Sequence, residues 1–173
     1  MSGLKANSRV ALLASVVLAL DQLTKFVVTQ RISRFEEIVL IDGFFKLVHW
    51  GNTGAAWSMF HDKNGLLAIV AIIALVVLVF ARHHFDVHTL GGQVALGLII
   101  GGIVGNLVDR IRIHHVIDFL RFYVPRRGTW PGDEAGFPAF NLADAAICTG
   151  VGLLFLLSWR NNGEKASEQS SAP

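Results

Sequence analysis

Four apolar segments, each close to the length needed to cross a lipid bilayer, limit what this chain of 173 residues can fold into. A spanning helix needs about 20 mostly apolar residues. Charged residues make up only 16% of the chain, against about 25% in an ordinary soluble domain, so most of the apolar surface must face lipid. The sequence predicts an all-α membrane protein, a bundle of four transmembrane helices at about residues 10–28, 66–81, 90–108 and 142–159.

The first span also has the features of a secretory signal peptide, because Lys5 and Arg9 precede its apolar run. No clean cleavage site of small residues follows, and three further spans need a first partner, so we interpret it as a bundle helix. The single cysteine, Cys148, excludes an intramolecular disulfide and suits a small packing residue. A net charge of +2 gives no case for nucleic-acid binding.

Two longer connecting segments, about 30–64 and 109–138, separate the spans. In the first, Asp42-Gly43 lies between two β-rich runs at 36–41 and 44–49, which is a hairpin pattern. We therefore expect a small β-sheet in this first large loop, lying on the membrane surface.

The end of the second segment, 128–138, is rich in glycine and proline and predicts an irregular loop. The tail at 161–173 is polar and serine-rich, and its composition predicts disorder. Residues 1–160 then form a single membrane domain.

Charge bias predicts an orientation for the bundle. An even number of spans places both termini on one side and both large loops on the other. Basic residues on the terminal side are Lys5, Arg9, Arg82, Arg160 and Lys165. Those on the loop side are Arg31, Arg34, Lys46, Lys63, Arg110, Arg112, Arg121, Arg126 and Arg127. The positive-inside rule, applied to these residues, places the loops in the cytoplasm.

Two aspartates, Asp118 and Asp144, lie at the edges of the last two apolar segments, in the sequences HVIDF and FNLADAA. A carboxylate beside lipid is costly, because the bilayer core cannot hydrate its charge. Two of them around one loop suggest a pair that shares a proton, with one acting as acid and the other as base in amide hydrolysis by water. Simpler interpretations exist for each: Asp118 as a surface residue of a short strand, and Asp144 as support for a helix start capped by Asn141. Their separation of 26 residues does not show that they meet.

Further polar residues lie within or beside the first and third spans. Asp21 and Lys25 are four residues apart, which favours a buried ion pair on one face of the first helix. Asp109 suits a structural ion pair. Asn106 and Arg110 also share a helix face and suit positioning roles. Arg110 has several possible partners, namely Asp109, Asp21, a lipid headgroup or a backbone carbonyl.

Three other patterns are weaker. The sequence NTGAAWS at 52–58 is either a tight turn or a place where backbone approaches a ligand. The adjacent residues His114 and His115, with Asp118, suit a metal site poorly, because neighbouring side chains of an extended segment point to opposite sides. Glycines at every fourth position of the third span favour close helix packing; they are Gly97, Gly101 and Gly105.

Five of these short motifs together resemble the bacterial lipoprotein signal peptidases, also called signal peptidase II. The motifs are DQLTK at 21–25, NTGAAWS at 52–58, GNLVDR at 105–110, HVIDF at 115–119 and FNLADA at 140–145. They occur in the order found in the family and the likeness covers about residues 8–160. One mild departure is Trp57, where many members carry phenylalanine.

The resemblance implies an intramembrane aspartyl endopeptidase that removes signal peptides from prolipoproteins, cutting just before a diacylglyceryl-modified cysteine. Asp118 and Asp144 match the catalytic pair of the family. The residues that match positions lining or supporting its site are Asp21, Lys25, Asn52, Gly54, Asn106, Arg110 and Asn141. The family needs neither metal nor cofactor, and it implies a monomer that contacts prolipoprotein substrates and membrane lipids.

The resemblance also implies a multi-pass protein of the inner membrane, with both termini in the cytoplasm and the active site near the periplasmic face. The first loop would form a periplasmic β-cradle. This orientation opposes the charge bias, and we favour it because the order of the motifs is the more specific evidence. Two other classes of protein keep carboxylates near a membrane: a proton-coupled transporter, and a non-catalytic scaffold that uses the charges for assembly.

Overall fold

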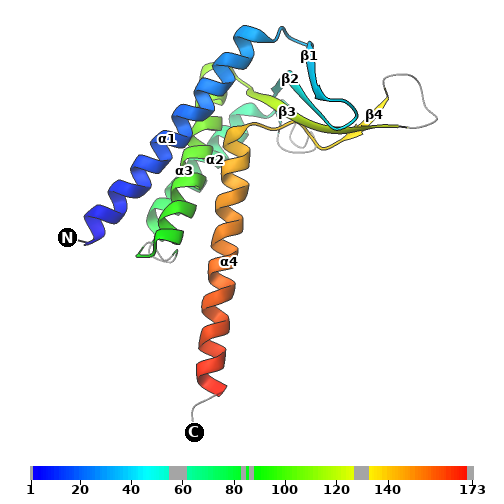
Figure 1. The fold of residues 1–173 in the computed structure, drawn as a ribbon. Helices are drawn as coiled ribbons and strands as arrows, with labels where there is room; N and C mark the ends of the chain where they lie inside the picture. The colour runs from blue at the N-terminus through cyan, green and yellow to red at the C-terminus, as the bar shows by residue number, and fades with distance from the viewer. Residues whose placement is uncertain (1, 55–61, 83–84, 86–87, 127–132, 171–173) are drawn as a thin grey trace.

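The computed structural model describes residues 2–54, 62–82, 85, 88–126 and 133–170, and contains four helices that are long and apolar enough to span a membrane. They are α1 (Ser2–Arg31), α2 (Asn64–Ala81), α3 (Leu90–Arg112) and α4 (Leu142–Ser170). The predicted number of spans is confirmed. The two chain ends lie at one end of the bundle and a small sheet lies at the other (Figure 1).

Helix α3 is the centre of the bundle and packs against each of the other three helices. Its glycines make this close approach possible. A Cβ added at Gly101 would lie 2.7 Å from the backbone oxygen of Ala14 in α1, and one added at Gly102 would lie 2.5 Å from that of Ala143 in α4. Any larger residue would therefore push the helices apart, which confirms the packing role predicted for the glycine row.

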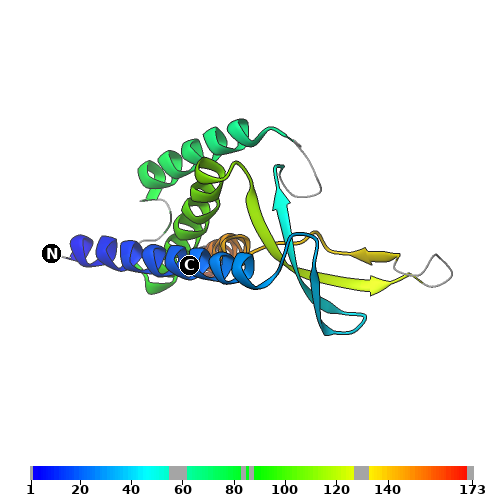
Figure 2. The ribbon, with the colours of Figure 1, turned by 90° about the horizontal axis from the view of Figure 1, so that it is seen from above.

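Helix α2 is attached differently. It contains no fully buried residue: the face that includes Leu67, Leu75 and Leu78 is half-buried, and the rest of its apolar surface is exposed, as with Phe80 at 77%. Seen along the bundle, α3 lies between α1 and α2 (Figure 2). An apolar helix this exposed is stable only where lipid or another apolar chain covers it.

The sheet has four antiparallel strands in the order β1 (Glu37–Ile41), β2 (Phe45–Asn52), β3 (Val116–Pro125) and β4 (Glu134–Gly136). The predicted β1–β2 hairpin is confirmed, with Gly43 at the positive φ of 69° that its turn requires. The sheet is larger than predicted for the first loop, because β3 and β4 from the second loop extend it. Part of the segment predicted to be irregular forms β4. A short stretch of sequence indicates a hairpin turn between neighbouring strands. It does not indicate the β2–β3 pairing, because that pairing joins residues about seventy positions apart.

The sheet is fixed to the bundle by a small apolar cluster. Val28 and Ile32, at the end of α1, pack with Ile117 and Phe119 of β3, and all four are buried. This contact holds β3 against the end of α1. Asp118 lies between the two buried strand residues, and because successive side chains of a strand alternate, it points to the opposite face of the sheet.

The helices are longer than the sequence-based bounds, and the difference is largest at two ends. Helix α1 begins at Ser2 rather than near residue 10, and α4 continues to Ser170, whereas residues 161–173 were predicted to be disordered. Helix formers such as Glu164, Lys165 and Ala166 can prolong a helix that the apolar span has already nucleated.

Candidate active site

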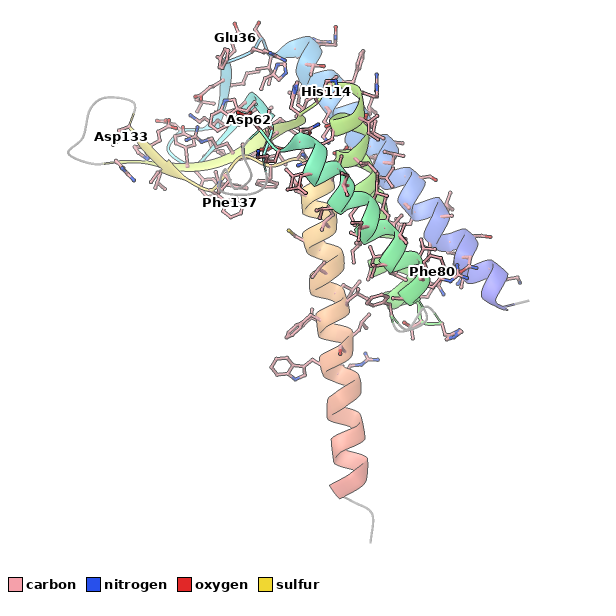
Figure 3. The ribbon with its side chains drawn as sticks, turned by 180° about the vertical axis from the view of Figure 1, so that it is seen from behind. Glu36, Asp62, Phe80, His114, Asp133 and Phe137 are labelled. Atoms are coloured by element: carbon pink, nitrogen blue, oxygen red, sulfur yellow. The ribbon has the colours of Figure 1, made fainter. Side chains whose placement is uncertain are left out.

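The polar residues singled out from the sequence converge where the sheet meets the bundle. Their side chains come from the end of β2, the end of α3, the middle of β3 and the start of α4. An open pocket of about 880 Å³ lies there, lined by Asn52, Gly54, Asn106, Arg110, Asp118 and Asp144. The other predicted site residues, Asp21, Lys25 and Asn141, are buried and are not part of its lining. Figure 3 shows Phe137, one of the residues lining this pocket, beneath the sheet on the side from which α4 descends.

Asp118 is held in the pocket by two amide groups. Its side chain accepts a hydrogen bond of 2.9 Å from Asn52 Nδ2 and another of 2.9 Å from Asn141 Nδ2. The residue is 3% exposed, so it is not the surface acid of the simpler interpretation. Burial, with the nearby charge of Asp144, raises the pKa of Asp118 to about 7, although the two amides act in the opposite direction.

Asp144 lies in the first turn of α4 and forms a reciprocal cap with Asn141. The Asp144 N–H donates to Asn141 Oδ1 at 3.0 Å, and the Asn141 N–H donates back to Asp144 Oδ2 at 3.2 Å. The predicted capping role is confirmed. The cap uses Oδ2 of Asp144, while Oδ1 of the same side chain accepts a hydrogen bond of 2.7 Å from Asn106 Nδ2. Asp144 is therefore both part of a cap and a side chain that faces the pocket with Asp118.

Each amide that holds a carboxylate is itself oriented by a second contact. Asn106 Oδ1 accepts from Lys25 Nζ at 2.9 Å and from Asn141 Nδ2 at 3.2 Å, so the Asn106 NH₂ group must face Asp144. Asn52 Oδ1 accepts from the Gly54 N–H at 2.9 Å, so its NH₂ group must face Asp118. Because each amide oxygen already accepts a hydrogen bond, it is the NH₂ group of each amide that contacts a carboxylate.

Lys25 is the centre of a buried charge network beneath the pocket. Its ammonium group lies 2.9 Å from Asp21 and 2.8 Å from Asp109, and its third contact is with Asn106. Its side chain is 2% exposed, and three partners match its three donors. The predicted Asp21–Lys25 pair is confirmed. The Ala143 N–H also donates to Asp21 at 3.0 Å, which links α1 to the start of α4.

Two members of this network were not predicted as site residues. Gln22 Nε2 donates to Asp109 at 3.0 Å and to the Gly105 carbonyl at 3.3 Å. Asp109 accepts the Ile117 N–H at 3.3 Å, which fixes the start of the strand that carries Asp118. The sequence did contain one signal for Gln22, because a polar side chain inside an apolar span usually has a polar partner there.

Arg110 binds a backbone carbonyl, which is one of the alternatives left open by its sequence. Its Nη2 donates to the Gly54 carbonyl at 3.0 Å, and its own carbonyl accepts from Asn64 Nδ2 at 3.0 Å. Asn52, Gly54 and Arg110 are thereby connected at the rim of the pocket. The rest of the NTGAAWS motif, residues 55–58, lies outside the described part of the chain.

The pocket also has walls that the sequence did not indicate. Trp50, Arg121 and Phe140 line its side toward the sheet, and Cys148 of α4 also belongs to its lining. The packing role predicted for Cys148 is wrong, because the residue is exposed.

Two carboxylates that share one pocket can hold a single proton between them. Among the described residues, neither Asp118 nor Asp144 forms an ion pair with a cation, and both are held by neutral amides. Like charges at short range disfavour the doubly ionised form. Within the described residues no group of three His, Cys, Asp or Glu could hold a metal ion. The geometry therefore suits acid–base chemistry on a bound water.

Comparisons with known proteins give a consistent result. The family described as "Signal peptidase (SPase) II" matches residues 13–160. A lipoprotein signal peptidase of Symbiobacterium thermophilum is 45% identical over 83% of this chain and 90% of its own length, and one of Bacillus subtilis is 33% identical over 91% and 97%. A solved structure of a bacterial membrane enzyme has a TM-score of 0.76 and 29% identity, with 90% of each chain covered.

Proposed function

Because the chain belongs to the signal peptidase II family, we propose that it is an intramembrane aspartyl endopeptidase with Asp118 and Asp144 as its catalytic pair. Membership makes it a membrane protease that removes signal peptides in lipoprotein maturation. The observation that carries the aspartyl assignment is the shared pocket, in which both carboxylates are oriented by amides and neither is neutralised by a cation among the described residues.

In the proposed reaction the two carboxyls share one proton before the substrate binds. The ionised carboxyl takes a proton from a water molecule as that water attacks the scissile carbonyl carbon. The protonated carboxyl donates a hydrogen bond to the carbonyl oxygen and stabilises the tetrahedral intermediate. The C–N bond then breaks, and the departing amine receives a proton from the pair. The apparent pKa values belong to the pair rather than to either residue.

The remaining predicted residues have supporting roles in this proposal. Asn52, Asn106 and Asn141 orient the carboxylates, and Lys25 with Asp21 orients Asn106. Arg110 and Gly54 form the rim past which the extended substrate would run. None of these roles needs a metal or a cofactor.

The proposed substrate is a prolipoprotein with a diacylglyceryl group on its cysteine, cut on the N-terminal side of that cysteine. Its signal helix would enter sideways from the bilayer, where the exposed helix α2 leaves apolar surface to cover. The acyl chains would remain in lipid. We expect the enzyme to work as a monomer, since one chain supplies both carboxyls and their supports.

We also propose that both termini lie in the cytoplasm and that the pocket opens near the periplasmic face of the inner membrane. Two of the basic residues that oppose this orientation are engaged by the protein itself. Lys46 pairs with Glu37 and Glu134, and Arg110 donates to Gly54. The charge of Lys46 is therefore compensated within the sheet, and Arg110 lines the pocket.

The test is a gel-shift cleavage assay in detergent with one prolipoprotein in two forms, with and without the diacylglyceryl group. The proposal predicts cleavage of the modified form alone. Equal cleavage of both forms would refute the dependence on lipid. If neither form is cut by protein whose fold is verified, proton flux in vesicles becomes the measurement, and a positive result there would establish a transporter instead.

A further inference from the structure

We infer that Trp50 and Arg121 form a specificity subsite that binds an acidic side chain of the substrate, a few residues beyond the scissile bond. This inference rests on the proposed peptidase function and deepens it. Both residues line the pocket that contains Asp118 and Asp144. The sheet supplies them, from β2 and β3, so they lie on the side of the pocket away from the helices.

The guanidinium group of Arg121 is held in place yet keeps its hydrogen-bonding capacity. It stacks over the Trp50 ring, with Cζ 4.4 Å from the ring centroid, and its side chain is 18% exposed. Within the described part of the chain it donates no hydrogen bond, and its ion-pair partner Glu134 is 3.6 Å away. Stacking on an aromatic ring leaves the edges of the guanidinium free, and those edges match a carboxylate in a bidentate geometry.

Glu134 is a weak competitor for Arg121, because it is already bound. Lys46, whose side chain is 2% exposed, lies 2.7 Å from Glu134 and also pairs with Glu37. Burial lowers the pKa of Lys46, but these two carboxylates outweigh that effect and raise it, so Lys46 stays charged and retains Glu134. An incoming carboxylate could thus approach Arg121 without breaking a short contact.

The second pocket arginine lies on another side of the pocket. Arg110 donates to the Gly54 carbonyl at 3.0 Å, on the side of the pocket toward α3. The two arginines therefore divide the pocket, with Arg110 at the rim and Arg121 along the sheet. A substrate anion that follows the sheet meets Arg121.

The strand spacing gives the position of the substrate residue. Arg121 follows Asp118 by three residues in β3, which corresponds to about 10 Å at about 3.3 Å per residue. Side chains three residues apart leave a strand on opposite faces, and Arg121 reaches the pocket by stacking over Trp50, whose register partner is Asp118. The signal helix of the substrate would lie in the bilayer beside the bundle, so the chain that runs along the sheet is the mature part. An extended substrate with its scissile bond at Asp118 would place a side chain about three residues after the cysteine near Arg121.

The experiment uses diacylglyceryl-modified substrates that differ at one position, with Asp, Asn or Lys placed in turn at each of the first few residues after the cysteine. The rate of cleavage at low substrate concentration is measured for the full-length wild type and for Arg121→Gln, Trp50→Leu and Glu134→Gln. Arg126→Gln is the matched control, because Arg126 directly follows the strand that carries Arg121, is 59% exposed and is absent from the pocket lining. Folding is checked by thermal unfolding in the same detergent.

We expect wild type to prefer Asp over Asn by about tenfold at one position, since a hydrogen bond between two charged groups is stronger than one to a neutral amide. Arg121→Gln should remove the preference, and Trp50→Leu should weaken it, while both still cut the Asn substrate. Glu134→Gln should increase the preference, because it removes the competing charge but keeps an oxygen for Lys46. Arg126→Gln should leave it unchanged.

Equal rates for Asp and Asn at every position in wild type would overturn the subsite, and so would an Asp preference that survives in Arg121→Gln. Neither result would affect the peptidase proposal, because wild type would still cut the modified substrate. A wild type that cuts no substrate at all would instead refute both.

Discussion

Replacing Lys25 by methionine tests the charge network beneath the pocket. Methionine keeps the length of the apolar stem and removes the charge. The side chains of Lys25, Asp21 and Asp109 are 2%, 0% and 5% exposed, so the change leaves two carboxylates in a site that water does not reach. Removing one partner of a buried ion pair costs about 3–5 kcal/mol.

The expected cost lies near the lower end of that range. Asp21 would keep its hydrogen bond from the Ala143 N–H, and Asp109 would keep those from Gln22 and the Ile117 N–H. We therefore expect a loss of about 3 kcal/mol in the free energy of unfolding. At about 2–4 °C per kcal/mol, the melting temperature should fall by about 6–12 °C.

The assay is thermal unfolding in detergent, followed by tryptophan fluorescence. Lys5→Met is the matched control, because Lys5 is exposed on the same helix and its replacement should change the melting temperature little. In the double variant Lys25→Met/Asp109→Asn, one of the stranded charges is gone, so part of the lost stability should return. If Lys25→Met melts within a degree of wild type, the network does not hold the helices as described.

Other predictions follow from the same geometry. Gly105→Ala would place a Cβ 2.6 Å from Asp21 Oδ2 and should cost about 1–3 kcal/mol of unfolding free energy, whereas Gly152→Ala, also within a helix but with nothing within 4 Å, should not destabilise the protein. Asn106→Leu removes a donor to Asp144 and an acceptor for Lys25; we expect kcat to fall by about tenfold or more, and an unchanged kcat would refute its positioning role. The folded pKa of Asp118, about 7, exceeds its usual value of 3.8. The stability that this residue contributes should therefore be complete below about pH 4 and lost as the pH rises to about 7, and Asp118→Asn should flatten denaturant unfolding measured across that window.

The sequence predicts the carboxylates better than it predicts their surroundings. Asp118 and Asp144 stand out because an acid beside an apolar segment is costly wherever the chain folds. The Asp21–Lys25 pair and the Asn141 cap depend on spacing within one helix, and both are confirmed. Each of these features is local, so a single sequence contains it.

The rest of the site depends on contacts between distant segments. Asn52 meets Asp118 across 66 residues, and Lys25 meets Asn106 across 81. The β2–β3 register, with its irregularity between Leu47 and Trp50, decides which side chains face the pocket. No periodicity in one strand encodes that register, so the contribution of β3 to the sheet, the burial of Asp118 and the place of Arg121 were not predictable.

The most direct measurement of the central claim is the cleavage rate of a diacylglyceryl-modified prolipoprotein by Asp118→Asn, Asp144→Asn and Asp133→Asn. Asp133 is the control, because it belongs to the same loop region, pairs with Arg126 and is absent from the pocket lining. If Asp118 and Asp144 act as a pair on one water, each of the first two variants should fold and lose cleavage, while Asp133→Asn should cut as wild type does. Normal cleavage by folded Asp118→Asn or folded Asp144→Asn would contradict the account.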